Sequence, residues 1–222
     1  APYLDHPKTL GSALFVASTM KVFLESPKVE LAHFFKLSEP TFMGWIGPRG
    51  RSMVPKAPLL AFEIFAKHFG GDLVESQTTS PTFDSPTVGL MPATTSTPWF
   101  EVIASKGSDG KIYLVGINKH FTAPVQGTIS IAGLTPDPSG VAWTLSGTGI
   151  DSHTGTELPR VPGINWATPI EIPPSRRINK GNPNEVTLSQ RRIDGIAARF
   201  DYSFPPRSVT SIEMAPASTE AK

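Results

Sequence analysis

The chain has 222 residues with 39% hydrophobic composition, which is enough to bury a sizeable core in one or two domains. Its formal net charge of +1 lacks the basic excess of a nucleic-acid-binding protein, and no run approaches the roughly 20 apolar residues of a membrane-spanning helix. The absence of Cys excludes disulfides and thiolate chemistry and leaves the compartment open, with a secreted or extracellular location weakly favoured.

The chain begins with residues 1–6, which contain neither an initiator methionine nor a signal peptide and so indicate a processed start or a start inside a longer protein. A helix is expected over residues 9–25, because apolar residues recur there at three- and four-residue spacing: Leu10, Ala13, Leu14, Ala17, Met20 and Leu24. Pro7 and Thr9 are typical of a helix start.

A buried strand is expected next, at Val29–Leu37, because this short run is continuously apolar. After a glycine-containing loop, a second helix is predicted from about Pro58 to Gly70. Its predicted apolar stripe consists of Leu59, Phe62, Phe65, Ala66 and Phe69. Helix, buried strand, loop and helix in this order suit the closing units of an α/β barrel and equally an open parallel sheet.

Beyond Gly71 the pattern changes to period-two alternation with abundant Pro, Thr, Ser and Gly, which indicates a domain boundary. Residues 99–104 and 111–118 predict a hairpin around the turn Ser108-Asp109-Gly110, because Asp-Gly readily supplies positive φ angles. Further strands are predicted at residues 127–131, 141–145, 185–188, 199–204 and 208–214. This many short strands predicts an antiparallel β-sandwich.

The order of these segments resembles glycoside hydrolase family 51, the α-L-arabinofuranosidases and their relatives, over nearly the whole chain. The resemblance is carried by Leu10–Ala17, Val29–His33, Phe62–Gly70, Gly110–Lys119 and Phe204–Val209. It implies the terminal βα units of a (β/α)8 TIM barrel at residues 1–70, followed by a C-terminal antiparallel β-sandwich at residues 71–222.

The resemblance also implies retaining glycosidase chemistry, in which one carboxylic acid protonates the leaving oxygen and a second carboxylate attacks the sugar carbon. In this family both carboxylates come from earlier barrel strands, so neither catalytic position transfers to a residue of this chain. The implied partner is an N-terminal polypeptide that carries the catalytic glutamates, and assembly of several copies of this chain stays open. Family members commonly carry Asn and Gln where this chain has His33 and Lys36, which leaves the preferred sugar open.

The best local candidates for sugar binding are Lys36, Glu39, Phe42 and Trp45, because the rim that follows a barrel strand carries the chemistry of that fold. Lys36 is suited to a sugar hydroxyl or carboxylate, although a solvated or paired Lys is the plainer interpretation. Glu39 fits sugar hydroxyls or an ordinary surface loop. Trp45 fits either an open stacking platform or a plug at the top of the barrel.

Other residues receive structural interpretations. His33 is expected to be buried against a carbonyl, and His68 to act as a cation at a helix end. The run Asp151-Ser152-His153-Thr154 is rejected as a triad, because neighbouring residues cannot hold that geometry. Trp143 is interpreted as core and Trp166 as the most exposed tryptophan. The basic residues Arg176, Arg177, Lys180, Arg191 and Arg192 are interpreted as a solvated surface or interdomain contact.

No metal site and no cofactor are predicted, because the histidines show no ligand spacing and phosphate-binding loops are missing from the sequence. We therefore expect the C-terminal portion or smaller chain of a retaining, arabinofuranosidase-like glycoside hydrolase that acts on plant or microbial polysaccharide and is inactive alone. The rival hypothesis is a non-catalytic carbohydrate-binding or structural β-sandwich protein. The helix, strand and helix at the start of the chain argue against it, because an autonomous sandwich needs no buried parallel strand.

Overall fold

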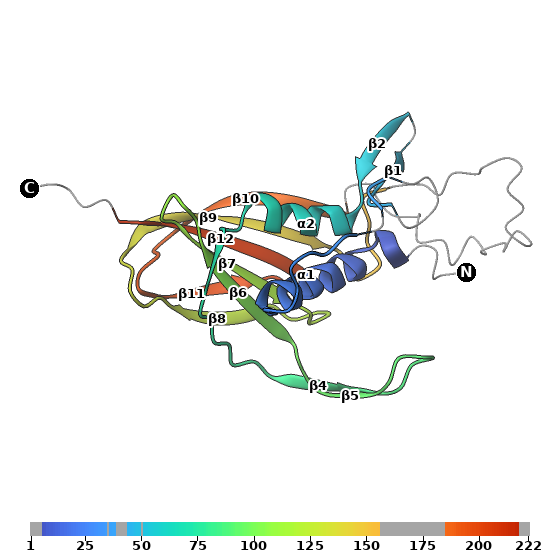
Figure 1. Cartoon of the computed structure of the whole chain (residues 1–222), viewed down its shortest axis with the longest axis horizontal. Helices are drawn as coiled ribbons and strands as arrows, with labels where there is room; N and C mark the ends of the chain where they lie inside the picture. The colour runs from blue at the N-terminus through green and yellow to red at the C-terminus, as the bar shows by residue number, and fades with distance from the viewer. Residues whose placement is uncertain (1–5, 35, 39–43, 50, 156–184, 218–222) are drawn as a thin grey trace, which may run out of the picture. The chain divides into compact units, whose positions relative to one another are not determined.

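The computed structural model describes residues 6–34, 36–38, 44–49, 51–155 and 185–217. The chain forms two compact units, one from residues 1–65 and 145–188 and the other from residues 66–144 and 189–222. The described part is mostly β-structure with two α-helices (Figure 1). Neither helix is long and apolar enough to span a membrane. The division at residues 70 and 71 that the composition indicates stays a prediction.

The first unit opens with a 3₁₀ turn, His6–Lys8, and helix α1, Leu10–Glu25, which confirms the first predicted helix. Thr9 caps it by accepting a hydrogen bond from the backbone N–H of Ser12 at 3.3 Å. The amino-terminal half of the predicted stripe is buried, from Leu10 to Ala17. The carboxyl-terminal half of the predicted stripe is less covered, as the 39% exposure of Leu24 shows.

The predicted buried strand Val29–Leu37 is wrong for this chain. Its described residues belong to no strand, and Leu31 and Phe34 are 73% and 50% exposed. A buried strand needs neighbours that pair its N–H and C=O groups along both edges. Pairing begins only at the end of the segment, with a parallel bridge between Ser38 and Ile46. The apolar composition of the segment suits a strand. The described residues contain no sheet with which it could pair.

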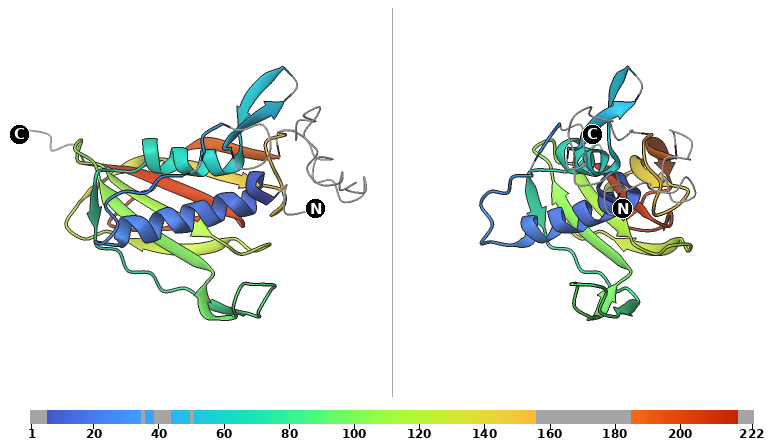
Figure 2. Two further views of the ribbon diagram at one scale, coloured as in Figure 1. Left: turned by 45° about the vertical axis from the view of Figure 1, so that its right-hand side comes forward. Right: turned by 90° about the vertical axis from the view of Figure 1, so that its right-hand side faces the viewer.

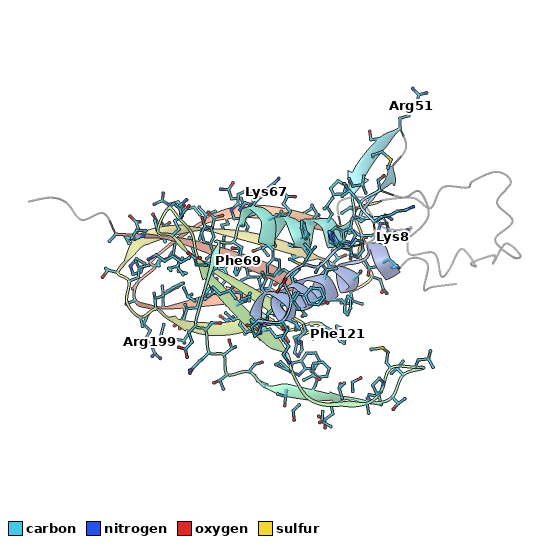
Figure 3. All side chains as sticks on the ribbon, viewed as in Figure 1. Lys8, Arg51, Lys67, Phe69, Phe121 and Arg199 are labelled. Carbon is cyan, nitrogen blue, oxygen red and sulfur yellow. The ribbon has the colours of Figure 1, made fainter. Side chains whose placement is uncertain are left out.

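Strands β1, Ile46–Arg49, and β2, Ser52–Pro55, form an antiparallel hairpin, with Arg51 at its tip (Figure 3). Helix α2, Ala57–Lys67, confirms the second predicted helix. Of the predicted stripe only Phe65 is buried, and Phe62 is 37% exposed; the other buried positions are Ala57, Pro58, Ala61 and Ile64. Apolar residues surround almost the whole helix, so periodicity could not select the buried face.

The second unit is built on a six-stranded sheet in the order β10-β9-β12-β7-β6-β3, in which β12–β7, β7–β6 and β6–β3 pair antiparallel. Its strands are β3 (Asp72–Val74), β6 (Phe100–Lys106), β7 (Ile112–Asn118), β9 (Pro136–Gly147), β10 (Val186–Asp194) and β12 (Ser208–Pro216). The unit contains β9 up to residue 144 and β10 from residue 189. The predicted hairpin is confirmed as β6–β7, with Gly110 at φ +80°.

Two smaller antiparallel ribbons complete this unit: β8 (Val125–Ser130) with β11 (Arg199–Phe204), and β4 (Thr82–Ser85) with β5 (Thr94–Pro98). In both views of Figure 2 the β4–β5 ribbon extends away from the other strands of the unit. The predicted strands at residues 127–131, 141–145, 185–188, 199–204 and 208–214 therefore all exist, and all but 199–204 have shifted ends. The specific combination of barrel end and sandwich stays a prediction.

The core of the second unit joins β8 and β11 to the large sheet. Its buried members are Phe100, Ile129, Ala142, Ile193, Ile196, Tyr202, Phe204, Ile212 and Met214. The rings of Phe100 and Phe204 lie 4.7 Å apart over Gly116, where an added Cβ would come within 2.6 Å of Phe204 and 2.8 Å of Phe100. Gly116 is thus required by the close approach of two aromatic rings.

Candidate functional site

The predicted sugar-binding residues fall partly on described positions. The Lys36 side chain is exposed, and its carbonyl accepts a hydrogen bond from the backbone N–H of Trp45 at 3.3 Å. Trp45 is buried, with 6% of its surface exposed. Glu39 and Phe42 lie outside the described residues. The backbone thus brings Lys36 and Trp45 together, and the four-residue site itself stays a prediction.

Trp45 lies between two phenylalanine rings. Phe34 stacks on it with ring centroids 3.8 Å apart and 22° between the planes, and Phe62 approaches at 5.3 Å and 46°. We call Phe34, Trp45 and Phe62 the Trp45 cluster. It closes because the carbonyl of Trp45 accepts a 2.7 Å hydrogen bond from the N–H of Lys56, immediately before α2. The aromatic cluster therefore joins the end of the 29–38 segment to helix α2.

The indole N–H of Trp45 is buried, and no described residue accepts a hydrogen bond from it. Burying an unpaired donor costs about 1 to 3 kcal/mol, and native proteins pair nearly all such groups. The nitrogen thus requires an acceptor from outside the described residues. Sequence patterns gave no sign of this requirement, because it arises from the packing of Phe34 and Phe62.

Two lysines of the first unit were missed by the sequence analysis. Lys8 and Lys56 are each only 3% exposed, and both have interaction partners. Lysine is almost never fully buried unless it is paired. A reading of the sequence alone would therefore place both side chains on the surface. Their burial therefore results from tertiary packing that the sequence pattern does not indicate.

The run Asp151–Thr154 forms a turn against the start of α1. The Ser152 Oγ accepts from the N–H of Gly149 at 2.8 Å, and the His153 Nδ1 accepts from the N–H of Gly155 at 2.9 Å. The carbonyl of Ser152 accepts from the N–H of Leu10 at 2.8 Å. These bonds engage serine and histidine separately, which suits a structural turn and not a nucleophile and its base.

His68 and Trp143 form a second paired arrangement, in the second unit. The His68 Nδ1 lies 2.8 Å from the Glu213 Oε1, and its ring stacks on Trp143 at 3.9 Å and 20°. His68 directly follows α2, which ends at Lys67, and it is buried, so the expectation that it acts as a cation at the helix end stays a prediction. Trp143, predicted as core, is half-buried beneath that ring.

The remaining candidates divide by position. His33, expected to be buried, is exposed. Arg191 lies 5.7 Å from the Tyr202 ring centroid, and Arg192 pairs with Asp194 at 2.9 Å. Trp166 and the basic residues Arg176, Arg177 and Lys180 lie outside the described residues. Among the described side chains no group of three or more His, Asp and Glu could hold a metal ion.

The β6–β7 turn carries the clearest electrostatic effect. The Lys111 ammonium donates a 2.9 Å hydrogen bond to the Asp109 carboxylate, which lowers the pKa of Asp109 and raises the pKa of Lys111. Burial is the main cause that raises the pKa of Tyr113, followed by the Asp109 charge. These groups stabilise a tight turn.

No protein-family model and no curated protein matches this chain. Solved structures do match. The thermostable family 51 α-L-arabinofuranosidase from Thermotoga petrophila RKU-1 has 21% identity and a TM-score of 0.74, covering 95% of this chain and 39% of that one. The α-L-arabinofuranosidase from Thermotoga maritima, solved with arabinose, gives 21% identity, a TM-score of 0.73 and the same coverage.

A family 51 arabinofuranosidase from Xanthomonas axonopodis pv. citri has 15% identity and a TM-score of 0.67, covering 93% of this chain and 36% of that one. At these identities the likeness is one of fold. Nearly all of this chain thus has the fold of a part of family 51 arabinofuranosidases, and the chain spans less than two fifths of their length.

Proposed function

We propose that this chain is the C-terminal portion or smaller chain of a retaining glycoside hydrolase, α-L-arabinofuranosidase-like, that acts on plant or microbial polysaccharide. One observation carries the proposal: 95% of the chain matches an arabinofuranosidase of which it covers only 39%. The catalytic acid and nucleophile belong to an N-terminal polypeptide of the same enzyme. This chain contributes one wall of the sugar pocket through Lys36, Glu39, Phe42 and Trp45.

The surface of the first unit supports the proposal that another polypeptide binds to it. Large apolar side chains between residues 15 and 37 are exposed: Phe15, Val22, Phe23, Leu24, Val29, Leu31, Phe34 and Leu37. Soluble monomers rarely expose extensive apolar surface. The matched enzymes have more than half of their length outside the region that this chain covers. We propose that the corresponding part of the complete enzyme packs on these exposed apolar side chains.

The Trp45 cluster supports the same arrangement. Its buried indole N–H needs an acceptor, and the complementary polypeptide or a bound sugar hydroxyl supplies one. In the completed site, the acid protonates the leaving oxygen while the nucleophile attacks the sugar carbon. The role of this chain in that reaction is to orient the sugar and exclude water, without taking part in proton transfer.

The rival function is a non-catalytic carbohydrate-binding or structural β protein. It draws support from the second unit, which has a β-sheet core of its own. The two hypotheses differ in whether a complementary polypeptide restores turnover.

The test is reconstitution of activity. The purified 222-residue chain is assayed alone and with the N-terminal polypeptide of the same enzyme, against a panel of aryl glycosides. We expect no turnover by the chain alone, and turnover with co-elution of both polypeptides in the mixture. Robust turnover by the repurified chain alone would place the catalytic carboxylates within it. Absence of both association and turnover would favour the rival.

A matched pair of variants locates the contact. Leu31→Asp puts a charge on the exposed apolar segment, where the side chain is 73% exposed, and should abolish co-elution. Leu90→Asp puts the same charge at a fully exposed position of the second unit and should leave co-elution unchanged. Equal behaviour of the two variants would contradict the assigned contact.

A further inference from the structure

A second aromatic group lies on the second unit, apart from the predicted pocket residues in sequence. The Trp99 ring has its centroid 4.0 Å from Phe83, 4.9 Å from His120 and 6.2 Å from Phe121. We call these four residues the Trp99 cluster. Figure 3 shows Phe121 close to the β4–β5 ribbon. Strand β4 and the loop between β7 and β8 therefore converge on the indole of Trp99, which links β5 to β6.

The ribbon register fixes the face on which Phe83 lies. Phe83 pairs directly with Thr97, so their side chains share one side of β4–β5. The N–H of Trp99 donates to the carbonyl of Pro81 at 3.0 Å, and the N–H of Phe100 donates to the Oγ of Ser80 at 3.0 Å. These bonds close the ribbon where it leaves the sheet, and the cluster lies at that base.

The loop that carries His120 and Phe121 is held by a buried amide. The Asn118 side chain is fully buried, and its Nδ2 lies 3.1 Å from the carbonyl of Phe204 and 2.8 Å from that of Pro205. Its Oδ1 accepts from the N–H of His120 at 3.0 Å. The loop is therefore pre-organised, and a ligand would lose little free energy in ordering it.

The cluster combines apolar rings with unused donors. Phe121 is 56% exposed on this anchored loop. The His120 Nδ1 accepts from the N–H groups of Thr122 and Ala123, at 3.2 and 2.9 Å, which leaves its proton on Nε2 as a donor. Neither that Nε2 nor the Trp99 Nε1 has an acceptor among the described residues, and both side chains are half-buried.

We propose that the Trp99 cluster is an accessory carbohydrate-binding site that holds a neutral sugar residue of a polysaccharide. The C–H face of a sugar ring packs against Phe121, and its hydroxyl oxygens accept hydrogen bonds from the indole and imidazole N–H groups. The choice of a polysaccharide sugar rests on the proposed function. The site acts by retaining the polymer and requires no catalytic group.

The experiment is affinity electrophoresis of the 222-residue chain in native gels containing soluble arabinan or arabinoxylan, with migration measured against polymer concentration. Phe121→Ala and Trp99→Phe are the test variants, of which the second keeps a ring and removes the N–H donor. Phe15→Ala is the matched control, because Phe15 is 68% exposed on α1. We expect Phe121→Ala to raise the apparent dissociation constant about three- to tenfold.

Trp99→Phe should weaken retention as well, and Phe15→Ala should migrate like the wild type. The Tm of Phe121→Ala should equal that of the wild type, because the removed side chain is more than half exposed. If both test variants were retained as strongly as the wild type, the proposal would be overturned. The cluster would then serve only to hold the ribbon in place. Absence of wild-type retention, or an equal loss in Phe15→Ala, would overturn it too. Because no turnover is measured, failure here is distinguishable from failure of the reconstitution assay.

Discussion

The ring of Phe34 lies 3.8 Å from the indole of Trp45, although Phe34 is half-exposed and Trp45 is buried. A side chain of an irregular segment thus covers the buried indole of Trp45. Trp45→Ala should lower the free energy of unfolding by about 3 to 5 kcal/mol, because it leaves a cavity. Urea denaturation measures this change, with the more exposed Phe62→Ala as the milder comparison. A normal unfolding free energy with lost sugar affinity would instead indicate an open stacking platform.

The His68–Glu213 pair should stabilise the second unit. Its side chains are 11% and 17% exposed, whereas those of the Arg192–Asp194 pair are 72% and 70% exposed. A double-mutant cycle with His68→Ala and Glu213→Gln should give a coupling of about 1 kcal/mol or more. The same cycle on Arg192 and Asp194 should give a few tenths at most, because water screens exposed charges. Equal couplings would show that burial does not strengthen the first pair.

The Asp109 carboxylate should contribute a pH-dependent part of stability. Its hydrogen bonds with Lys111 lower its pKa below the ordinary 3.8, so its contribution is present above that value and is lost as pH falls through the folded pKa. Asp109→Asn should therefore lower Tm near pH 7, and the difference from the wild type should shrink below about pH 4. Thermal melting from pH 7 to pH 2 measures this. A difference that persists undiminished at pH 2 would contradict the assignment.

Gly116→Ala should destabilise the core of the second unit. The new methyl group would lie within 2.6 Å of the Phe204 ring, and overpacking of this kind costs about 1 to 3 kcal/mol. Gly71→Ala is the matched control, since no described residue other than its two chain neighbours lies within 4 Å of the position that a Cβ would take there. Chemical denaturation of both variants compares them. Similar unfolding free energies would show that the two rings move apart without cost.

The sequence by itself determined the elements whose causes are local. The Thr9 cap and apolar spacing located α1, and Asp109-Gly110 located the β6–β7 hairpin, because a helix start and a tight turn depend on a few neighbouring residues. The segment resemblance also led to the family whose solved structures match the fold of this chain.

Only the tertiary structure decided the features that depend on distant partners. Val29–Leu37 has a strand-like composition and forms no strand in the described residues, because pairing groups must come from elsewhere. Three features follow from packing across long sequence separations: the buried face of α2, the contact between His68 and Glu213, and the burial of the Trp45 indole N–H without an acceptor among the described residues. Periodicity identifies which side chains are apolar, and the arrangement of neighbouring elements determines which of them are covered.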